Sequence, residues 1–208
     1  NLKTYDYQFG LNSTPIYEKV FKKRRMEKLK ILELGVANGH SIASWHHYFP
    51  NSIIYGIDNK KPFKFFYRSK RVKYFQINIF DQKQIDSFVK KHGKFDYIID
   101  DSINTEEAML MNIKNFYPSL NSGGAYFLED FGFYDHKQKA MQKVKEYNLN
   151  YNMKYFLNCR TMREILEMIK NKTLFEDKIL DKKILEFIFS TLKDIEFGNY
   201  EHPYAAIA

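Results

Sequence analysis

The chain contains 208 residues, of which 44% are hydrophobic and 17% aromatic, so it is long and apolar enough for one α/β domain with a sizeable core. No apolar run reaches the roughly 18 residues of a membrane-spanning helix, and the single cysteine, Cys159, excludes an internal disulfide and fits a reducing, cytoplasmic compartment. The formal net charge of +8 is compatible with nucleic-acid binding, although abundant lysine on solvated faces is the simpler explanation.

The first predicted element is a short helix near the N-terminus. Residues 12–15, Asn-Ser-Thr-Pro, are typical of a helix start because they offer a capping hydroxyl and a proline for the first turn. The apolar face of this helix would consist of Ile16, Tyr17, Val20 and Phe21.

Residues 30–49 carry the first motif. The apolar run at 30–34 predicts a buried strand, and Gly35 and Gly39 then bracket a tight loop. Apolar residues recur at helical spacing over about 40–49. A strand, a glycine loop and a helix start in this order form the first unit of a nucleotide-binding sheet, where free backbone N–H groups can face a ligand.

The loop does not match the common phosphate-binding patterns. Ala37 takes the position of the second glycine in a dinucleotide fingerprint, and no Lys-Ser or Lys-Thr pair follows Gly39. Glu33 precedes the loop, where its charge would repel a pyrophosphate, and Asp58 ends the next predicted strand, 53–57, where it could bind a ribose diol. These two acids favour a ligand that has a ribose and a cationic centre but no phosphate.

The segment Glu33–Ser41 resembles the first motif of the class I S-adenosylmethionine-dependent methyltransferases, and Asp58 corresponds to their ribose-binding acid. The resemblance implies an α/β, Rossmann-like fold with a seven-stranded, mostly parallel sheet, helices on both faces, and S-adenosylmethionine as the methyl donor. It places around the donor Glu33, Gly35, Ala37, Asn38, Gly39, Ser41, Asp58, Ile77, Asn78 and Asp100.

The remaining elements complete this fold. Beyond residue 58 we expect a strand at 72–77, a helix ended by Gly93, a strand at 95–101, a helix at 106–117, a turn at 121–124 and a strand at 125–128. Helical patterns follow at 136–147, 161–170 and 181–193, and two short strands at 195–197 and 204–208. We expect a single domain made of an N-terminal cap (1–29), a donor-binding core (30–131), a helical lid (132–194) inserted before the final hairpin, and that closing hairpin (195–208).

Two pairs of acids end neighbouring strands if 95–101 and 125–128 lie side by side. Asp100-Asp101 and Glu129-Asp130 would then meet at one edge of the sheet, beside the glycine loop. Carboxylates gathered in this way repel one another unless a cation intervenes, and oxygen ligands suit a hard ion such as Mg²⁺. The alternative is that these acids cap helices or pair with lysines.

Residues 98–102 and 122–130 resemble a narrower group, the metal-dependent macrolide-sugar O-methyltransferases and the related cephalosporin-hydroxylase-like proteins. The likeness runs from about Gly10 to Phe131. It implies that the metal ligands are Asp101, Glu129 and Asp130. It also implies a histidine base at position 104, where this chain has Asn104, so either His136 or Asp101 acts as the base or the chemistry needs no strong base.

The sequence therefore predicts an S-adenosylmethionine-dependent methyltransferase that O-methylates a sugar or a sugar-containing small molecule with the help of a metal. The acceptor could be an anionic derivative such as a nucleotide sugar; we expect no membrane association, and a homo-oligomer is compatible with the sequence. One alternative is an RNA methyltransferase, favoured by the charge, although residues 100–103 lack the Asn/Asp-Pro-Pro-aromatic signature of base-methylating enzymes. The other is a non-catalytic donor-binding module, in which Asn104 marks lost activity.

Overall fold

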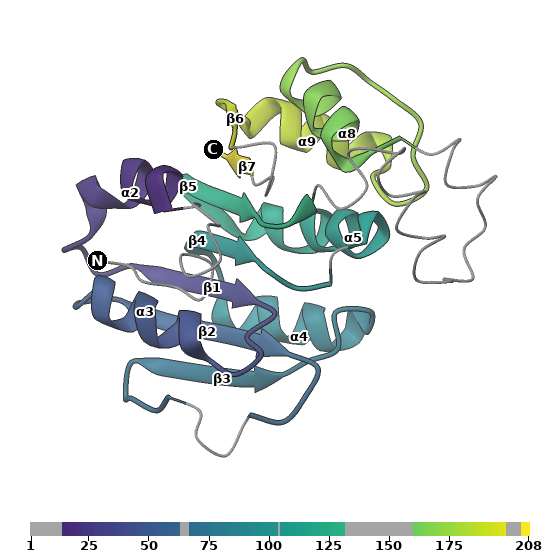
Figure 1. The fold of residues 1–208 in the computed structure, drawn as a ribbon. Coiled ribbons are helices and arrows are strands. Elements are labelled where there is room, and N and C mark those ends of the chain that lie inside the picture. The colour runs from purple at the N-terminus through teal and green to yellow at the C-terminus, as the bar shows by residue number, and fades with distance from the viewer. Residues whose placement is uncertain (1–13, 63–66, 104, 132–159, 199–204) are drawn as a thin grey trace, which may run out of the picture.

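A seven-stranded sheet with the strand order β3-β2-β1-β4-β5-β7-β6 forms the centre of the molecule (Figure 1). It is seen in a computed structural model that describes residues 14–62, 67–103, 105–131, 160–198 and 205–208. Strands β1 to β5 are parallel, and β7 runs antiparallel to both β5 and β6. The bounds are β1 (Lys30–Leu34), β2 (Ile53–Asp58), β3 (Val72–Gln76), β4 (Phe95–Asp100), β5 (Leu120–Leu128), β6 (Ile195–Phe197) and β7 (Ala205–Ile207). The predicted sheet and its mostly parallel character are confirmed.

Helices cover both faces of the sheet and enclose two hydrophobic cores (Figure 1). Successive residues of a strand point to opposite faces, so Ile31 and Phe127 enter one core while Leu32 and Tyr126 enter the other. The first core lies under α2 (Thr14–Phe21) and α3 (His40–Tyr48). The second lies under α4 (Gln82–His92), α5 (Glu106–Phe116), α8 (Met162–Lys170) and α9 (Lys182–Thr191). Short 3-10 helices follow α2 and α5, at Lys22–Arg24 and Tyr117–Ser119.

The segment predicted to be a lid contributes directly to the second core. Helix α8 starts with a capping box between Thr161 and Glu164, and it buries Leu166 and Ile169. Helix α9 buries Leu185 in the same core. The predicted helix at 136–147 lies outside the described residues, and the lid and the division of the chain stay predictions. None of the described helices is long and apolar enough to cross a membrane.

The turn expected at residues 121–124 is wrong, because these residues lie inside β5. The pairing of β4 with β5 shifts between Phe95–Leu120 and Tyr97–Ala125, so β5 bulges by four residues where β4 has only Asp96. The Asp96 carboxylate stabilises the bulge by accepting hydrogen bonds from the Asn121 side chain at 3.2 Å and from the Lys30 N–H at 2.9 Å. The glycines thus make a bulge within a strand, which brings β5 back into register beside β4.

Candidate functional site

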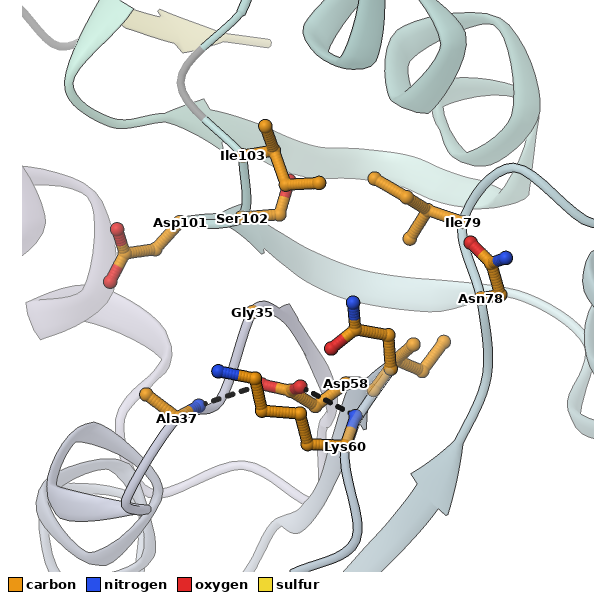
Figure 2. Close-up of a pocket in the computed structure, with 11 residues that line it drawn as sticks. Gly35, Ala37, Asp58, Lys60, Asn78, Ile79, Asp101, Ser102 and Ile103 are labelled. Atoms are coloured by element: carbon orange, nitrogen blue, oxygen red, sulfur yellow. Dashed lines mark hydrogen bonds between the residues drawn. The ribbon is translucent and has the colours of Figure 1, made fainter.

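A pocket of about 270 Å³ opens at the carboxyl ends of the central strands (Figure 2). Strand β1 lies between β2 and β4, so the strand order changes direction there, and ligands of open α/β sheets bind at this point. The pocket is lined by Gly35, Ala37, Ile57, Asp58, Asn59, Lys60, Asn78, Ile79, Asp101, Ser102 and Ile103. Four of the residues predicted to bind the donor, Gly35, Ala37, Asp58 and Asn78, therefore come together in one cavity.

Gly35 brings the loop after β1 against the end of β4. Its φ of +85° is a conformation that side-chain-bearing residues rarely adopt. A Cβ at this position would lie 2.1 Å from the carbonyl oxygen of Asp101 and 2.5 Å from the Cα of Ser102. The absence of a side chain at Gly35 is therefore what allows the two pocket walls to touch.

Asp58 joins the glycine loop to the loop after β2. Its Oδ2 accepts a hydrogen bond from the Ala37 N–H at 2.9 Å, and its Oδ1 accepts one from the Lys60 N–H at 3.0 Å (Figure 2). Ala37 itself has a positive φ of 45°, so the bond to Asp58 helps to hold the loop in an uncommon conformation. The carboxylate thus lies in the pocket wall, anchored from both sides.

Glu33 and Ser41 lie beneath the loop and form a buried pair. Glu33 is 1% exposed, and the Ser41 hydroxyl donates a hydrogen bond to its carboxyl group. Burial raises the pKa of Glu33 to about 8, and the hydrogen bond from Ser41 opposes this shift. Glu33 is therefore mostly protonated at neutral pH and does not present a charge to the pocket.

The other predicted donor contacts also lie around the pocket wall rather than in it. Gly39 caps the start of α3 with a φ of 81°, and Asn38 is exposed beside it. Ile77 is 7% exposed and packs in the second core below Asn78. These three residues, like Glu33, Ser41 and Asp100, are not among the residues that line the cavity.

Asp100 forms a buried network behind the end of β4. Its carboxylate accepts hydrogen bonds from Tyr126 at 2.7 Å, Ser102 at 2.7 Å and the Asn112 amide at 3.0 Å. Burial raises the pKa of Asp100 to about 6, against the lowering effect of these bonds. Asp100 therefore holds Ser102 and the adjoining pocket wall in place, while the next residue, Asp101, faces the pocket.

The predicted metal ligands lie at two adjacent strand ends. The N–H of Glu129 donates to the carbonyl of Asp100 at 3.0 Å, so the parallel pairing continues past β4 and β5 and sets Asp101 beside Glu129. All three acids, Asp130 included, are partly exposed. Among the described residues no three His, Cys, Asp or Glu side chains are gathered as ready-made metal ligands. The backbone thus sets Asp101 and Glu129 at neighbouring positions, but the three acid side chains do not form a ready-made metal cluster, and their assignment to a metal stays a prediction.

Of the residues predicted to take part in catalysis, Asp101 lines the pocket. Asn104 and His136 lie outside the described residues. Sequence reasoning missed Ile79, Ser102 and Ile103 in the pocket, together with Ile57, Asn59 and Lys60. The last three flank Asp58 in the chain, so their proximity to a predicted ligand residue was the signal that could have identified them.

No protein-family model matches the chain. The mycinamicin VI 2''-O-methyltransferase of Micromonospora griseorubida is 28% identical over 124 residues, which are 56% of this chain and 31% of that protein. The 8-demethyl-8-(2-methoxy-α-L-rhamnosyl)-tetracenomycin-C 3'-O-methyltransferase of Streptomyces olivaceus is 29% identical over 124 residues, which are again 56% of this chain and 31% of that protein. The chain thus spans about a third of the length of the curated relatives that it matches.

Solved structures share the fold. The MycE methyltransferase from the mycinamycin biosynthetic pathway, in complex with Mg and SAH, superposes with a TM-score of 0.69 at 19% identity, covering 94% of this chain and 49% of that one. The same enzyme with Mg, SAH and mycinamycin VI gives a TM-score of 0.66 at 20% identity, covering 93% and 48%. The chain has the class I methyltransferase fold, and its predicted resemblance to the sugar O-methyltransferases is confirmed.

The contact at Gly35 predicts a large cost for the smallest possible side chain. Gly35→Ala should lower the free energy of unfolding by at least about 3 kcal/mol, because the added methyl group overlaps backbone atoms that cannot rotate away. Gly123→Ala is a matched control, since Gly123 has a φ of +75° but no atom within 4 Å of the added Cβ. It should cost only about 1–2 kcal/mol, from the backbone conformation alone. Urea unfolding measures both, and equal losses would contradict the proposed overlap.

The buried Glu33 predicts a pH dependence of stability. Its pKa is about 8 in the folded chain against an ordinary value of 4.5, so the folded state holds the proton more tightly and the free energy of unfolding falls as the pH rises between these values. Glu33→Gln cannot titrate. The decline in unfolding free energy from pH 5 to pH 8 should therefore shrink by on the order of 1–4 kcal/mol. Glu167→Gln, at an exposed position of α8, should leave the profile unchanged, and a wild-type slope in Glu33→Gln would exclude Glu33 as its source.

Proposed function

We propose that the chain carries the donor-binding and metal-binding parts of an S-adenosylmethionine-dependent sugar O-methyltransferase. The observation that carries this proposal is the pocket at the ends of β1, β2 and β4, where a carboxylate, Asp58, is held beside a glycine loop. The similarity to sugar O-methyltransferases over 124 residues supports the same function. The burial of the acids agrees with it, because Asp58, Asp101, Glu129 and Asp130 are partly exposed and can be reached by a ligand.

The donor contacts follow from the positions in the pocket. Asp58 would accept hydrogen bonds from the ribose hydroxyls, and the side-chain-free edge at Gly35 lets a ligand approach the backbone closely. Asn78 lines the cavity on the side away from the glycine loop, and it would contact the adenine ring (Figure 2). When bound, the donor supplies an electrophilic methyl group next to a positively charged sulfur. Neighbouring carboxylates such as Asp101 stabilise a positive charge in this position.

Asp101, Glu129 and Asp130 would hold a divalent cation, most suitably Mg²⁺. Their donor atoms are all carboxylate oxygens, which match a hard ion, and the pairing of Glu129 with the end of β4 brings two of them to neighbouring positions. When bound, such an ion lowers the pKa of a coordinated sugar hydroxyl and orients it. The role of the protein here is to set the acids at one edge of the donor pocket.

The acceptor would be a small molecule that contains a sugar. A net charge of +8 favours an anionic derivative such as a nucleotide sugar. The hydroxyl proton has to leave as the methyl group arrives, and a base within hydrogen-bonding reach serves this step. With Asn104 in place of the histidine of the resembling group, Asp101 or His136 is the proposed base.

The first test concerns the donor pocket. Asp58→Ala should weaken the binding of S-adenosylhomocysteine by about 1–3 kcal/mol, roughly 5- to 150-fold, because a charged hydrogen-bond acceptor is lost. Isothermal titration calorimetry measures the affinity. Asp86→Ala, which removes an exposed acid of α4 away from the pocket, is the matched control and should bind as the wild type does. An unchanged affinity in Asp58→Ala would remove Asp58 from the donor site.

The second test concerns the metal. Combining Glu129→Ala with Asp130→Ala should abolish Mg²⁺ binding, because two of the three proposed ligands are removed, and should leave the affinity for S-adenosylhomocysteine within about twofold. Titration calorimetry with Mg²⁺ and with the donor product follows the two sites separately. Mg²⁺ binding that survives both substitutions would show that these acids are not its ligands.

A further inference from the structure

Tyr17 is a buried residue of α2 whose ring is fixed by the first core. The side chain is 4% exposed, and its ring centroid lies 5.2 Å from that of Phe21, 5.1 Å from Trp45 and 4.8 Å from Phe127. These three rings belong to α2, α3 and β5. Because contacts come from three different elements, the direction of the Tyr17 hydroxyl is set by packing rather than by solvent.

The Tyr17 hydroxyl donates a hydrogen bond to Oε1 of Glu129. Glu129 comes two residues after Phe127, and such residues share a face of a strand, so one tyrosine contacts both the core ring and the acid. Asp101 follows Ile99 by the same interval, and Ile99 also packs in the core under α2 and α3. Glu129 and Asp101 therefore leave the sheet on the side that α2 covers.

We propose that Tyr17 is a positioning residue that orients the Glu129 carboxylate for a divalent cation. The inference rests on the proposed function in one respect, the assignment of Glu129 as a ligand of that cation. A carboxylate with one oxygen held by a fixed donor loses fewer rotamers when it binds a cation. Mutation of a residue that hydrogen-bonds to a metal ligand typically lowers the affinity for the metal 10- to 100-fold. Helix α2 thereby becomes part of a site whose ligands come from the ends of β4 and β5.

The experiment compares Tyr17→Phe with Tyr97→Phe in the donor-free protein. Both substitutions keep the ring and remove one hydroxyl from the same aromatic core, but the Tyr97 hydroxyl points at the backbone carbonyl of Val20, at 3.5 Å. Binding of Mn²⁺ alone is measured by the loss of the free-ion signal in electron paramagnetic resonance, with Mg²⁺ as competitor. Emission of Trp45, the single tryptophan of the chain, reports whether the packing around residue 17 is kept.

Tyr17→Phe should weaken Mn²⁺ binding at least about 10-fold, while Tyr97→Phe should change it less than about twofold. In a Glu129→Gln background, the further change Tyr17→Phe should have less than about a twofold effect, because the carboxylate that Tyr17 orients is gone. This double-mutant comparison separates orientation of Glu129 from general loosening of the core, which would weaken binding in both backgrounds.

Two results would overturn the inference in distinguishable ways. Wild-type affinity in Tyr17→Phe, or equal losses in Tyr17→Phe and Tyr97→Phe, would overturn the role of Tyr17 and leave the proposed metal site standing. A wild-type protein that binds no Mn²⁺ would overturn the proposed metal site and the role of Tyr17 together.

Discussion

The close contact between Gly35 and the end of β4 is the constraint on which the rest of the site depends. The carbonyl oxygen of Asp101 occupies the space where a side chain at position 35 would stand. The glycine loop and the acidic end of β4 are therefore held as one unit, and Asp58 fixes the other side of the loop through its bond to Ala37. The shape of the pocket is thus set by the backbone contact at Gly35 and by the hydrogen bond from the Ala37 N–H to Asp58.

The acids of the sheet edge fall into two groups with different physical roles. Glu33 and Asp100 are buried, their pKa values are raised by burial, and they hold neighbouring residues in place. Asp58 and Asp101 line the cavity instead. Alternation along β4 separates Asp100 from Asp101, whereas Glu33 lies within β1 and is covered by α3, whose Ser41 donates a hydrogen bond to it. A cluster of acids in the sequence therefore contains both structural and ligand-facing members.

Most of the fold could be predicted from the sequence because its signals are local. The apolar run of β1 and the Asp181 cap of α9 each fix an element through residues that are close in the chain. The glycines at 123 and 124 misled the prediction, because whether they make a turn or a bulge depends on Asp96 in another strand. The site residues also divide into those with a local signal and those that depend on distant contacts. Asp58 could be recognised from its distance to the loop, whereas the contact of Tyr17 with Glu129 joins residues 112 positions apart and depends on tertiary packing.

The position of β7 has a consequence for the chain during translation. β7 is the last of the seven strands to be made, yet it lies between β5 and β6. Until the ribosome has delivered residues 205–207, none of the other described strands can pair with the backbone N–H and C=O groups at the outer edge of β5 over residues 126–128. Open edges of this kind can pair with strands of other chains, so a nascent chain that lacks β7 exposes a place for such pairing. The three residues of β7 thus cover the edge of β5 and prevent it from pairing with a strand of another nascent chain.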